Sequence, residues 1–196
     1  MGDRSGGHFQ YLSDRCGREK AARLTFYILA RLLRWMAEGT LLIAWHSRTG
    51  ASEALARAAA QGAGLAALLA RADEVRPEDL IGARAYLFVC PENLATMSGL
   101  MKEMFDRCYY PVLGQIEGRA YATIIAAGSD GEGAQRQVDR IATGWRLRRV
   151  ADPIIVNVHA QTPQEILAPK HLDSAQLARA SDLGAALAEG IELGIY

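Results

Sequence analysis

The chain has 196 residues, enough for one domain whose core needs no disulfide or metal to stabilise it. Half of the residues are hydrophobic, and 22 basic side chains balance 22 acidic ones, which excludes the charge bias typical of nucleic-acid or membrane-surface binding. The three cysteines, Cys16, Cys90 and Cys108, have no CxxC or Cys/His ligand spacing. They predict neither a disulfide framework nor a metal site, and a reducing cytoplasm is the simplest compartment.

Residues 1–39 differ from the rest and are interpreted as an N-terminal extension. Residues 1–20 are polar and lack periodicity, which predicts disorder, whereas Glu19 to Glu38 has the pattern of an amphipathic helix. A signal peptide or membrane anchor is disfavoured, because Arg31 and Arg34 interrupt the apolar run and no small-x-small cleavage site follows. We therefore expect the folded domain to span residues 40–196.

The first part of this domain reads as strand, turn and helix. Leu41 to Trp45 predicts a short buried strand, and a hydroxyl-rich turn leads to a helix that opens at Glu53 and stops at Gly62 or Gly64. The Ala/Leu run at residues 65–70 suits either a helix or a strand, and its length favours a short buried strand. The charged stretch 72–80 is expected to be a loop.

The middle of the domain repeats this alternation. A buried strand is expected at residues 85–90, followed by a loop at 91–98 and a helix capped by Ser98. Tyr109, Tyr110 and Pro111 are expected to end that helix, with the tyrosines at an interface or lining a pocket. Its inner face is predicted to carry Leu100, Met101, Met104, Phe105 and Cys108.

The last third completes the pattern. A strand is predicted at residues 120–127, a glycine-rich loop at 128–133, a helix at 134–145 and a strand at 153–158. Thr162-Pro163-Gln164-Glu165 has the form of a capping box that starts a short helix. Asp173, with Gln176 three residues later, starts the final helix.

Five apolar strands that alternate with helices predict an α/β fold with a doubly wound parallel sheet covered on both faces. This number of units fits the flavodoxin-like five-stranded order 2-1-3-4-5. In that order the turns after residues 45, 90 and 127 converge at the carboxyl edge of the sheet, where such folds bind ligands.

The first of these turns, SRTGAS at residues 47–52, has the chemistry of a phosphate site. A helix N-terminus offers unpaired N–H groups and the positive end of its dipole, and the hydroxyls add donors. The turn lacks the GxGxxG of dinucleotide sites and the GxxxxGK[ST] of a P-loop. It matches [ST]-x-T-G-x-[ST] and here resembles the phosphate loop of flavodoxins, although a plain helix cap is the alternative reading.

The other two turns extend the resemblance. PENLATMSG at residues 91–99, followed by LMKEMFDR, resembles a segment of NAD(P)H-dependent FMN reductases and of larger flavodoxin-like oxidoreductases. GSDGEG at 128–133 resembles the glycine-rich loop that closes over the flavin in the same group. The resemblance extends from about Thr40 to Tyr196.

What the resemblance implies is FMN, with its phosphate on the first turn and its isoalloxazine ring on the second, facing the third. The implied cofactor-binding residues are Ser47, Arg48, Thr49, Gly50, Ala51, Ser52, Pro91, Glu92, Asn93, Leu94, Ala95, Thr96, Met97, Gly128, Ser129, Asp130 and Gly133. Backbone N–H groups of such turns can approach a planar ring closely and tune its redox state.

Several residues have two readings. Glu92 and Asp130 are candidates for polar contacts at the site or solvated loop carboxylates. His46 and Arg48 could neutralise a phosphate, but a plain loop side chain is the simpler interpretation of His46. Cys90, Cys108 and Trp45 are interpreted as core residues. No side chain is identifiable as a catalytic acid or base.

The resemblance implies an FMN oxidoreductase that uses NAD(P)H to reduce a quinone or another small electron acceptor. The second turn offers Asn93 and Leu94 rather than aromatic side chains, and the net charge is zero, unlike the acidic flavodoxins. The alternatives are a flavodoxin-type electron-transfer protein and a non-redox phosphate- or nucleotide-binding module. A homo-oligomer, dimer or tetramer, is also implied, whereas nucleic acid and membranes are not expected as partners.

Overall fold

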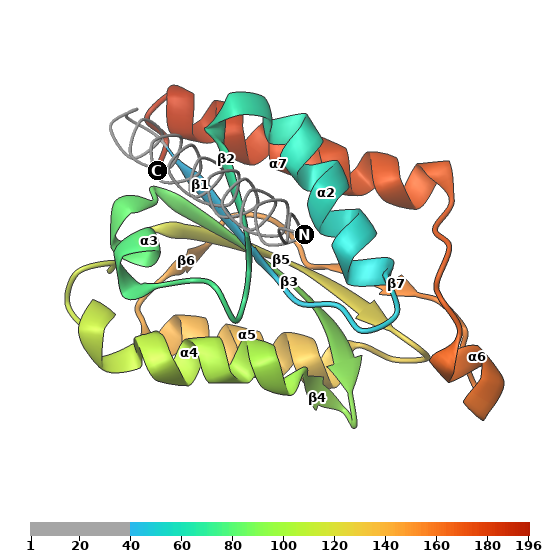
Figure 1. The fold of residues 1–196 in the computed structure, drawn as a ribbon. Helices are drawn as coiled ribbons and strands as arrows, with labels where there is room; N and C mark the ends of the chain where they lie inside the picture. Colours follow the sequence, from blue (N-terminus) through green and yellow to red (C-terminus); the bar gives the residue numbers. More distant parts are fainter. Residues whose placement is uncertain (1–39) are drawn as a thin grey trace, which may run out of the picture. The chain divides into compact units, whose positions relative to one another are not determined.

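The computed structural model describes residues 40–196, which form a parallel sheet with helices on both faces (Figure 1). The predicted disorder at residues 1–20 and the predicted helix at 19–38 lie outside the described residues. No helix within residues 40–196 is long and apolar enough to cross a membrane.

The five main strands are parallel and lie in the order β2-β1-β3-β5-β7, which confirms the predicted order 2-1-3-4-5. Strand β5, next to the central strand β3, pairs at its start with a short strand β6 and at its end with β7. The strands are β1 (Leu41–Trp45), β2 (Ala67–Arg71), β3 (Ala85–Asn93), β5 (Ala120–Ala127), β6 (Arg148–Arg149) and β7 (Ile154–Asn157).

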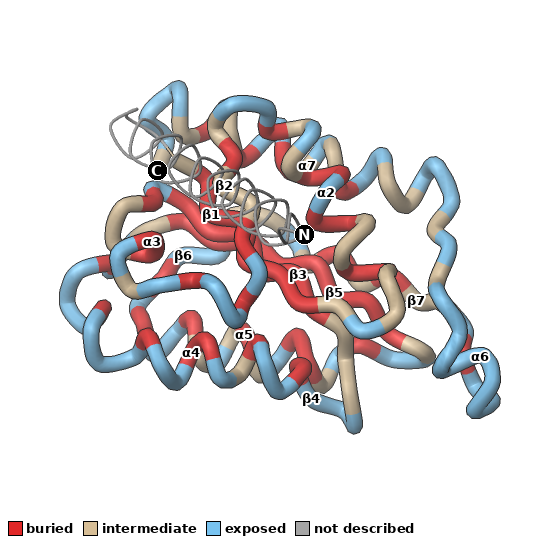
Figure 2. Tube along the Cα trace, in the orientation of Figure 1, coloured by how far each residue is buried: buried red, intermediate tan, exposed pale blue. Residues whose placement is uncertain are grey.

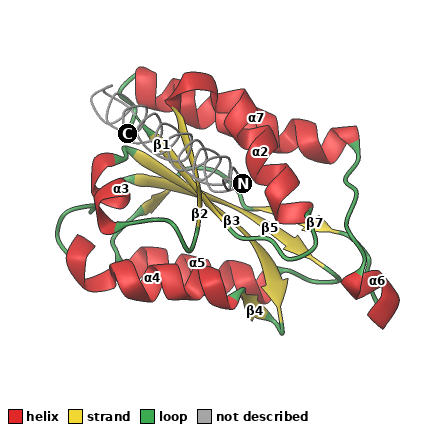
Figure 3. Cartoon of the chain, in the orientation of Figure 1, coloured by secondary structure: helices red, strands yellow, loops and turns green. Residues whose placement is uncertain are grey.

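Helices cover both faces of the sheet (Figure 3). Helices α2 (Ala51–Ala63) and α7 (Ser174–Glu192) lie on one face, and α3 (Pro77–Gly82), α4 (Gly99–Val112) and α5 (Glu132–Gly144) lie on the other. Leu41 and Ile43 of β1 pack toward the first set, while Leu42 and Ala44 pack toward the second. Strands β1, β3 and β5 are therefore buried along most of their length, as Figure 2 shows, which explains why they read as apolar runs.

The structure corrects the predicted loop at residues 91–98. Strand β3 continues to Asn93, turns at Leu94 and Ala95, and returns as the antiparallel strand β4 (Thr96–Met97). Leu94 and Ala95 both have left-handed backbones, with φ of 54° and 60°. Asn-Gly normally occupies such a two-residue hairpin turn, so the sequence carried no signal for it.

Other predicted elements are confirmed or shifted. The strand at 120–127 and the capping boxes at Thr162 and Asp173 are confirmed, the first box starting α6 (Pro163–Leu167). The predicted loop at 72–80 is wrong, because α3 begins there. Its Pro77 occupies the first turn, and the Asp79 carboxylate accepts a 2.8 Å hydrogen bond from the Arg76 N–H.

Smaller corrections concern element starts and one side chain. Helix α2 begins at Ala51 rather than Glu53. A 3-10 turn (Gly64–Ala66) delays the second strand to Ala67, because the first residues of the Ala/Leu run belong to that turn. Leu100 is 40% exposed and does not lie on the inner face of α4. Cys90, Cys108 and Trp45 are core residues, as expected.

Candidate functional site

Three turns gather at the carboxyl edge of the parallel sheet. We call them loop 1 (residues 46–50, after β1), loop 2 (residues 91–97, the end of β3 with β4) and loop 3 (residues 128–133, after β5 and including the first two residues of α5). Parallel pairing of β1 with β3 and of β3 with β5 brings the ends of these strands to one edge (Figure 1). This edge is where ligands bind in open α/β sheets.

Loop 1 is folded tightly against the start of α2. The Gly50 N–H donates to the Ser47 hydroxyl over 3.0 Å, and Gly50 has a left-handed backbone with φ of 98°. Gly50 is the N-cap of α2, and no side chain caps this helix. The first amides of α2 are thus not consumed by a capping residue, which is the arrangement that accepts an anion.

Ser52, in the first turn of α2, is 1% exposed, and its hydroxyl has no hydrogen-bond partner within the described chain. Burying a hydroxyl without a partner costs free energy, so native structures rarely keep one. A phosphate on loop 1 would supply the missing acceptor. The donor set of this turn therefore fits a phosphate group.

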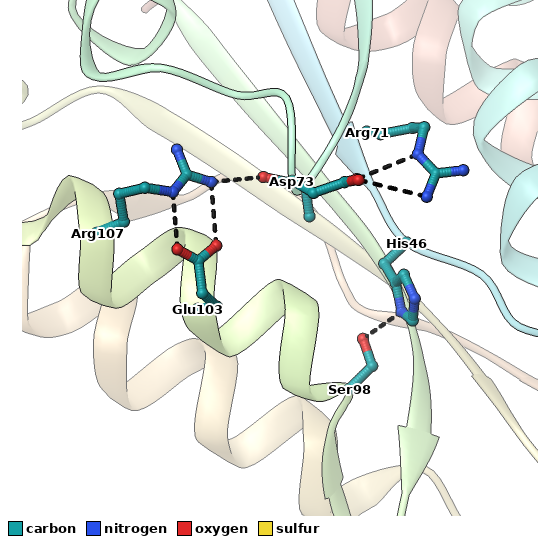
Figure 4. Close-up of polar contacts among 7 residues, drawn as sticks. His46, Arg71, Asp73, Ser98, Glu103 and Arg107 are labelled. Carbon is teal, nitrogen blue, oxygen red and sulfur yellow. Dashed lines mark hydrogen bonds and ion pairs between the residues drawn. The ribbon is translucent and has the colours of Figure 1, made fainter.

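His46 is buried, contrary to its interpretation as a plain loop side chain. Its Nδ1 shares a 2.8 Å hydrogen bond with the Ser98 hydroxyl, which links the end of β1 to the start of α4 (Figure 4). Burial lowers the pKa of His46 below its ordinary value of 6.5, and the nearby Arg71 and Arg48 lower it further, opposed by Asp73. Ser98 occupies the N-cap position of α4 but uses its hydroxyl for this bond rather than for a cap.

Arg71, at the end of β2, is a cation beside loop 1 that sequence reasoning missed. Its guanidinium lies 5.6 Å from the centre of the Trp45 ring and pairs with Asp73 over 3.1 Å (Figure 4). The side chain is thereby held at the carboxyl edge, next to the strand that leads into loop 1. Arg71 pairs with Trp45 in the sheet, and this pairing could have identified it. The pairing could not be derived from the sequence, because the Ala/Leu run suited either a helix or a strand.

Glu92 joins loop 2 to loop 3. Its carboxylate accepts hydrogen bonds from the Gly131 N–H over 2.7 Å and from the Ala134 N–H over 3.2 Å. Because Gly131 is the N-cap of α5, the carboxylate also lies at the positive end of that helix dipole. The Glu92 carboxylate is therefore engaged in the fold rather than a solvated loop carboxylate, and it ties loop 2 to loop 3.

The same two loops touch through their backbones. A Cβ added at Gly133 would overlap the carbonyl oxygen of Ala95, so only glycine allows the hairpin tip to lie against α5. The Met97 N–H donates to Gln137 of α5 over 3.0 Å. Loop 2 and the start of α5 consequently form one rigid wall of the edge, with Leu94 99% exposed at its tip.

The predicted site residues thus lie at one edge of the sheet. Ser47, Thr49, Gly50 and Ser52 lie in or directly after loop 1, and Arg48 is exposed within it. Asp130 is exposed in loop 3, where no hydrogen bond within residues 40–196 fixes its carboxylate. The sequence did not assign Arg71, Ser98 or the segment after β7 to the site; Ser98 and the segment make contacts that join parts of the chain distant in sequence.

The fold and the three loops define a flavodoxin-like α/β protein. No protein-family model matches the sequence. The chain is 29% identical to a flavodoxin of Aquifex aeolicus (strain VF5) over 99 residues, which cover 48% of this chain and 54% of that protein. The match thus spans about half the length of that curated relative.

Solved structures agree with this assignment. A flavodoxin from the domain Archaea superposes with a TM-score of 0.62 at 16% identity, covering 78% of this chain and 99% of its own. A flavodoxin, WrbA-like protein from Agrobacterium tumefaciens superposes with a TM-score of 0.60 at 18% identity, covering 79% and 98%. The flavodoxin-like fold is established, and the predicted resemblance to flavodoxins is confirmed.

Proposed function

We propose that this chain binds FMN without a covalent bond, with the phosphate on loop 1. The observation that carries the proposal is the buried Ser52 hydroxyl that lacks a partner at the N-terminus of α2. The uncapped amides after Gly50 and the Ser47 and Thr49 hydroxyls supply further donors. The names of the similar proteins, which are flavodoxins, support the same cofactor.

For the ring end we propose loops 2 and 3, as the resemblance implies. Their backbones are pre-organised, because Glu92 fixes loop 3 and Gly133 accepts the hairpin tip. Glu92 would then act by holding the loops, whereas Asp130 keeps an unengaged carboxylate for a polar contact. A bound FMN would supply one- and two-electron redox chemistry, and these residues would orient its ring.

We further propose an NAD(P)H-dependent oxidoreductase that reduces a quinone or a similar small acceptor. Neither loop 2 nor loop 3 contains an aromatic side chain, and the formal net charge is zero, both of which favour a reductase over an acidic electron shuttle. The flavodoxin names of the similar proteins favour the second candidate, an electron-transfer protein. A homo-oligomer in a reducing cytoplasm stays part of the proposal.

Two measurements test these statements in turn. Protein mixed with FMN and passed through a desalting column should retain the flavin and quench its fluorescence; free, unquenched flavin would overturn FMN binding. A protein that retains inorganic phosphate but no flavin would instead be a non-redox phosphate-binding module. The flavin-loaded protein should then oxidise NADH or NADPH when a quinone is present, whereas an electron shuttle would leave both nucleotides almost unchanged.

A further inference from the structure

The chain makes a long detour between β7 and α7. After Asn157 it does not enter α7 directly but runs through residues 158–173, which include the short helix α6. We call residues 157–171 the β7–α7 segment. Figure 1 shows α6 at the same end of the sheet as the arrowheads of β5 and β7.

The first half of the β7–α7 segment is attached to loop 3. The Ala160 N–H donates to the Gly128 carbonyl over 3.1 Å, and the Gln161 side-chain amide reaches the same oxygen over 3.3 Å. The Asn157 side-chain amide donates to the Ser129 carbonyl. Three hydrogen bonds thus fix this part of the segment to the loop proposed to face the flavin ring.

The second half is attached to loop 1. The Lys170 N–H donates to the Thr49 carbonyl over 2.7 Å. The carbonyl oxygen of Lys170 also lies in ordinary van der Waals range of Gly50, 3.8 Å from the place a Cβ would take. The β7–α7 segment therefore contacts both the loop proposed for the phosphate and the loop proposed for the ring.

The segment is itself rigidly built. The Lys170 ammonium donates to carbonyls at the end of α6, including Ala168 over 2.7 Å, and so caps this helix. At the other end of α6 the Glu165 carboxylate accepts the N–H groups of Gln161 and Thr162. Pre-organised walls of this kind are typical of small-molecule sites.

These walls border a cavity of about 490 Å³ that is open to solvent, within the size range of small-molecule pockets. Its apolar surface comes from small residues of the segment. The lining residues are Asn157, Val158, His159, Ala160, Glu165, Ala168, Pro169, Lys170, His171 and Gln176.

The lining offers mainly unused donors. Most side-chain oxygens of the lining are engaged: those of Asn157 and Gln176 and Oε2 of Glu165 accept hydrogen bonds from backbone N–H groups, and Oε1 of Glu165 alone among them accepts none within residues 40–196. By contrast, no hydrogen bond or ion pair within residues 40–196 involves the imidazole of His159 or His171, and the side-chain N–H₂ of Gln176 is also unused. The Lys170 ammonium adds a fixed positive charge beside them.

We propose that this cavity binds a small organic molecule through a carboxylate or phosphate group, held by His159, His171 and Gln176. Imidazole and amide N–H groups donate to anionic oxygens, and hydrogen bonds to charged groups are the stronger class. The ligand would lie beside loops 1 and 3 and outside the phosphate site of loop 1. Under the proposed function this ligand is the electron donor or acceptor, and that role rests on the proposed function. Binding of the ligand in the cavity does not.

The test uses ¹⁵N-labelled full-length protein mixed with FMN, observed through its histidine side-chain NMR signals. Inorganic phosphate and succinate are titrated separately, which distinguishes a phosphate from a carboxylate preference. The buried His46 serves as the internal reference beside loop 1. We expect the His159 and His171 signals to shift and saturate with one probe or both, while His46 does not respond.

Three variants and a control sharpen the test. His159→Asn, observed through the His171 signal, and His171→Gln, observed through the His159 signal, should each weaken probe binding about tenfold, the loss expected when one charge-assisted donor is removed. Asparagine is chosen at position 159 because φ is 50° there, and asparagine tolerates a left-handed backbone. Ala168→Trp should block the cavity without removing a donor. Arg179→Gln, an exposed change on α7 outside the lining, should leave binding unchanged.

The outcomes separate this proposal from the proposed function. Histidine signals that stay unchanged at millimolar concentrations of both probes overturn the cavity site, whether or not FMN is retained. Signals that respond to FMN alone and then to neither probe also overturn it, because the cavity would belong to the cofactor site. Saturating shifts in a protein that retains no FMN support the cavity site and overturn the flavin proposal alone.

Discussion

Replacing Ser52 with alanine should have opposite effects on the protein without FMN and on FMN binding. In the structure the Ser52 hydroxyl is buried and has no partner, and such a group costs about 1–3 kcal/mol. Ser52→Ala should therefore raise the free energy of unfolding of the flavin-free protein by about 1 kcal/mol. A hydrogen bond from this hydroxyl to a phosphate is worth about 1.5–3 kcal/mol, so FMN affinity should fall about 10- to 100-fold.

Urea unfolding followed by circular dichroism measures the first effect, and titration of flavin fluorescence measures the second. Ser174→Ala is the matched control, because Ser174 is exposed at the start of α7 and should change neither quantity. The reasoning is refuted if Ser52→Ala destabilises the flavin-free protein and leaves FMN affinity unchanged. That result would mean that the hydroxyl serves the fold rather than a ligand.

Three further predictions follow from the contacts at the sheet edge. The pKa of His46 is lowered in the fold, so the unfolded chain binds more protons as the pH falls below about 6.5, and stability should decline there. His46→Asn should reduce the difference between the urea midpoints measured at neutral and at mildly acidic pH. An unchanged difference would contradict this. Gly133→Ala should push the Ala95 hairpin away from α5, lower the free energy of unfolding in urea by about 2 kcal/mol and weaken FMN retention. Gly144→Ala, on the same helix but with open space around its Cβ, should do neither. Equal effects of the two variants would argue against the contact. Leu94→Asn with Ala95→Gly should stabilise the protein by about 1–2 kcal/mol in the same assay, because asparagine and glycine adopt the left-handed backbone of these two positions at lower cost. A destabilised variant would show that the native pair is needed at the tip.

The sheet could be predicted from the sequence because its strands are buried on both faces. Residues 41–45 are apolar throughout and residues 120–127 are apolar except for Thr123, so these runs could be located from the sequence alone. The capping boxes at Thr162 and Asp173 were equally local signals. Helix α3 was missed although Pro77 and Asp79 form a helix start, because the surrounding charges were interpreted as a loop.

The candidate site was predicted as three turns, but its internal contacts were not. The His46–Ser98 bond joins residues 52 positions apart, and Glu92 reaches Gly131 across 39 positions. No periodicity or motif encodes such pairs, since they arise from packing of the finished sheet. The contacts of the β7–α7 segment with loops 1 and 3 were hidden for the same reason, whereas the hairpin tip at Leu94 was missed because its two turn residues are not the usual Asn-Gly.

The most direct test of the central claim, a phosphate site on loop 1 that holds FMN, is a paired titration with FMN and with riboflavin, which lacks the phosphate. Fluorescence quenching should give a dissociation constant for FMN at least about 100-fold lower than for riboflavin, because only FMN engages the amides and hydroxyls around Gly50 and Ser52. Equal affinity for the two flavins, or binding of neither, would contradict the account.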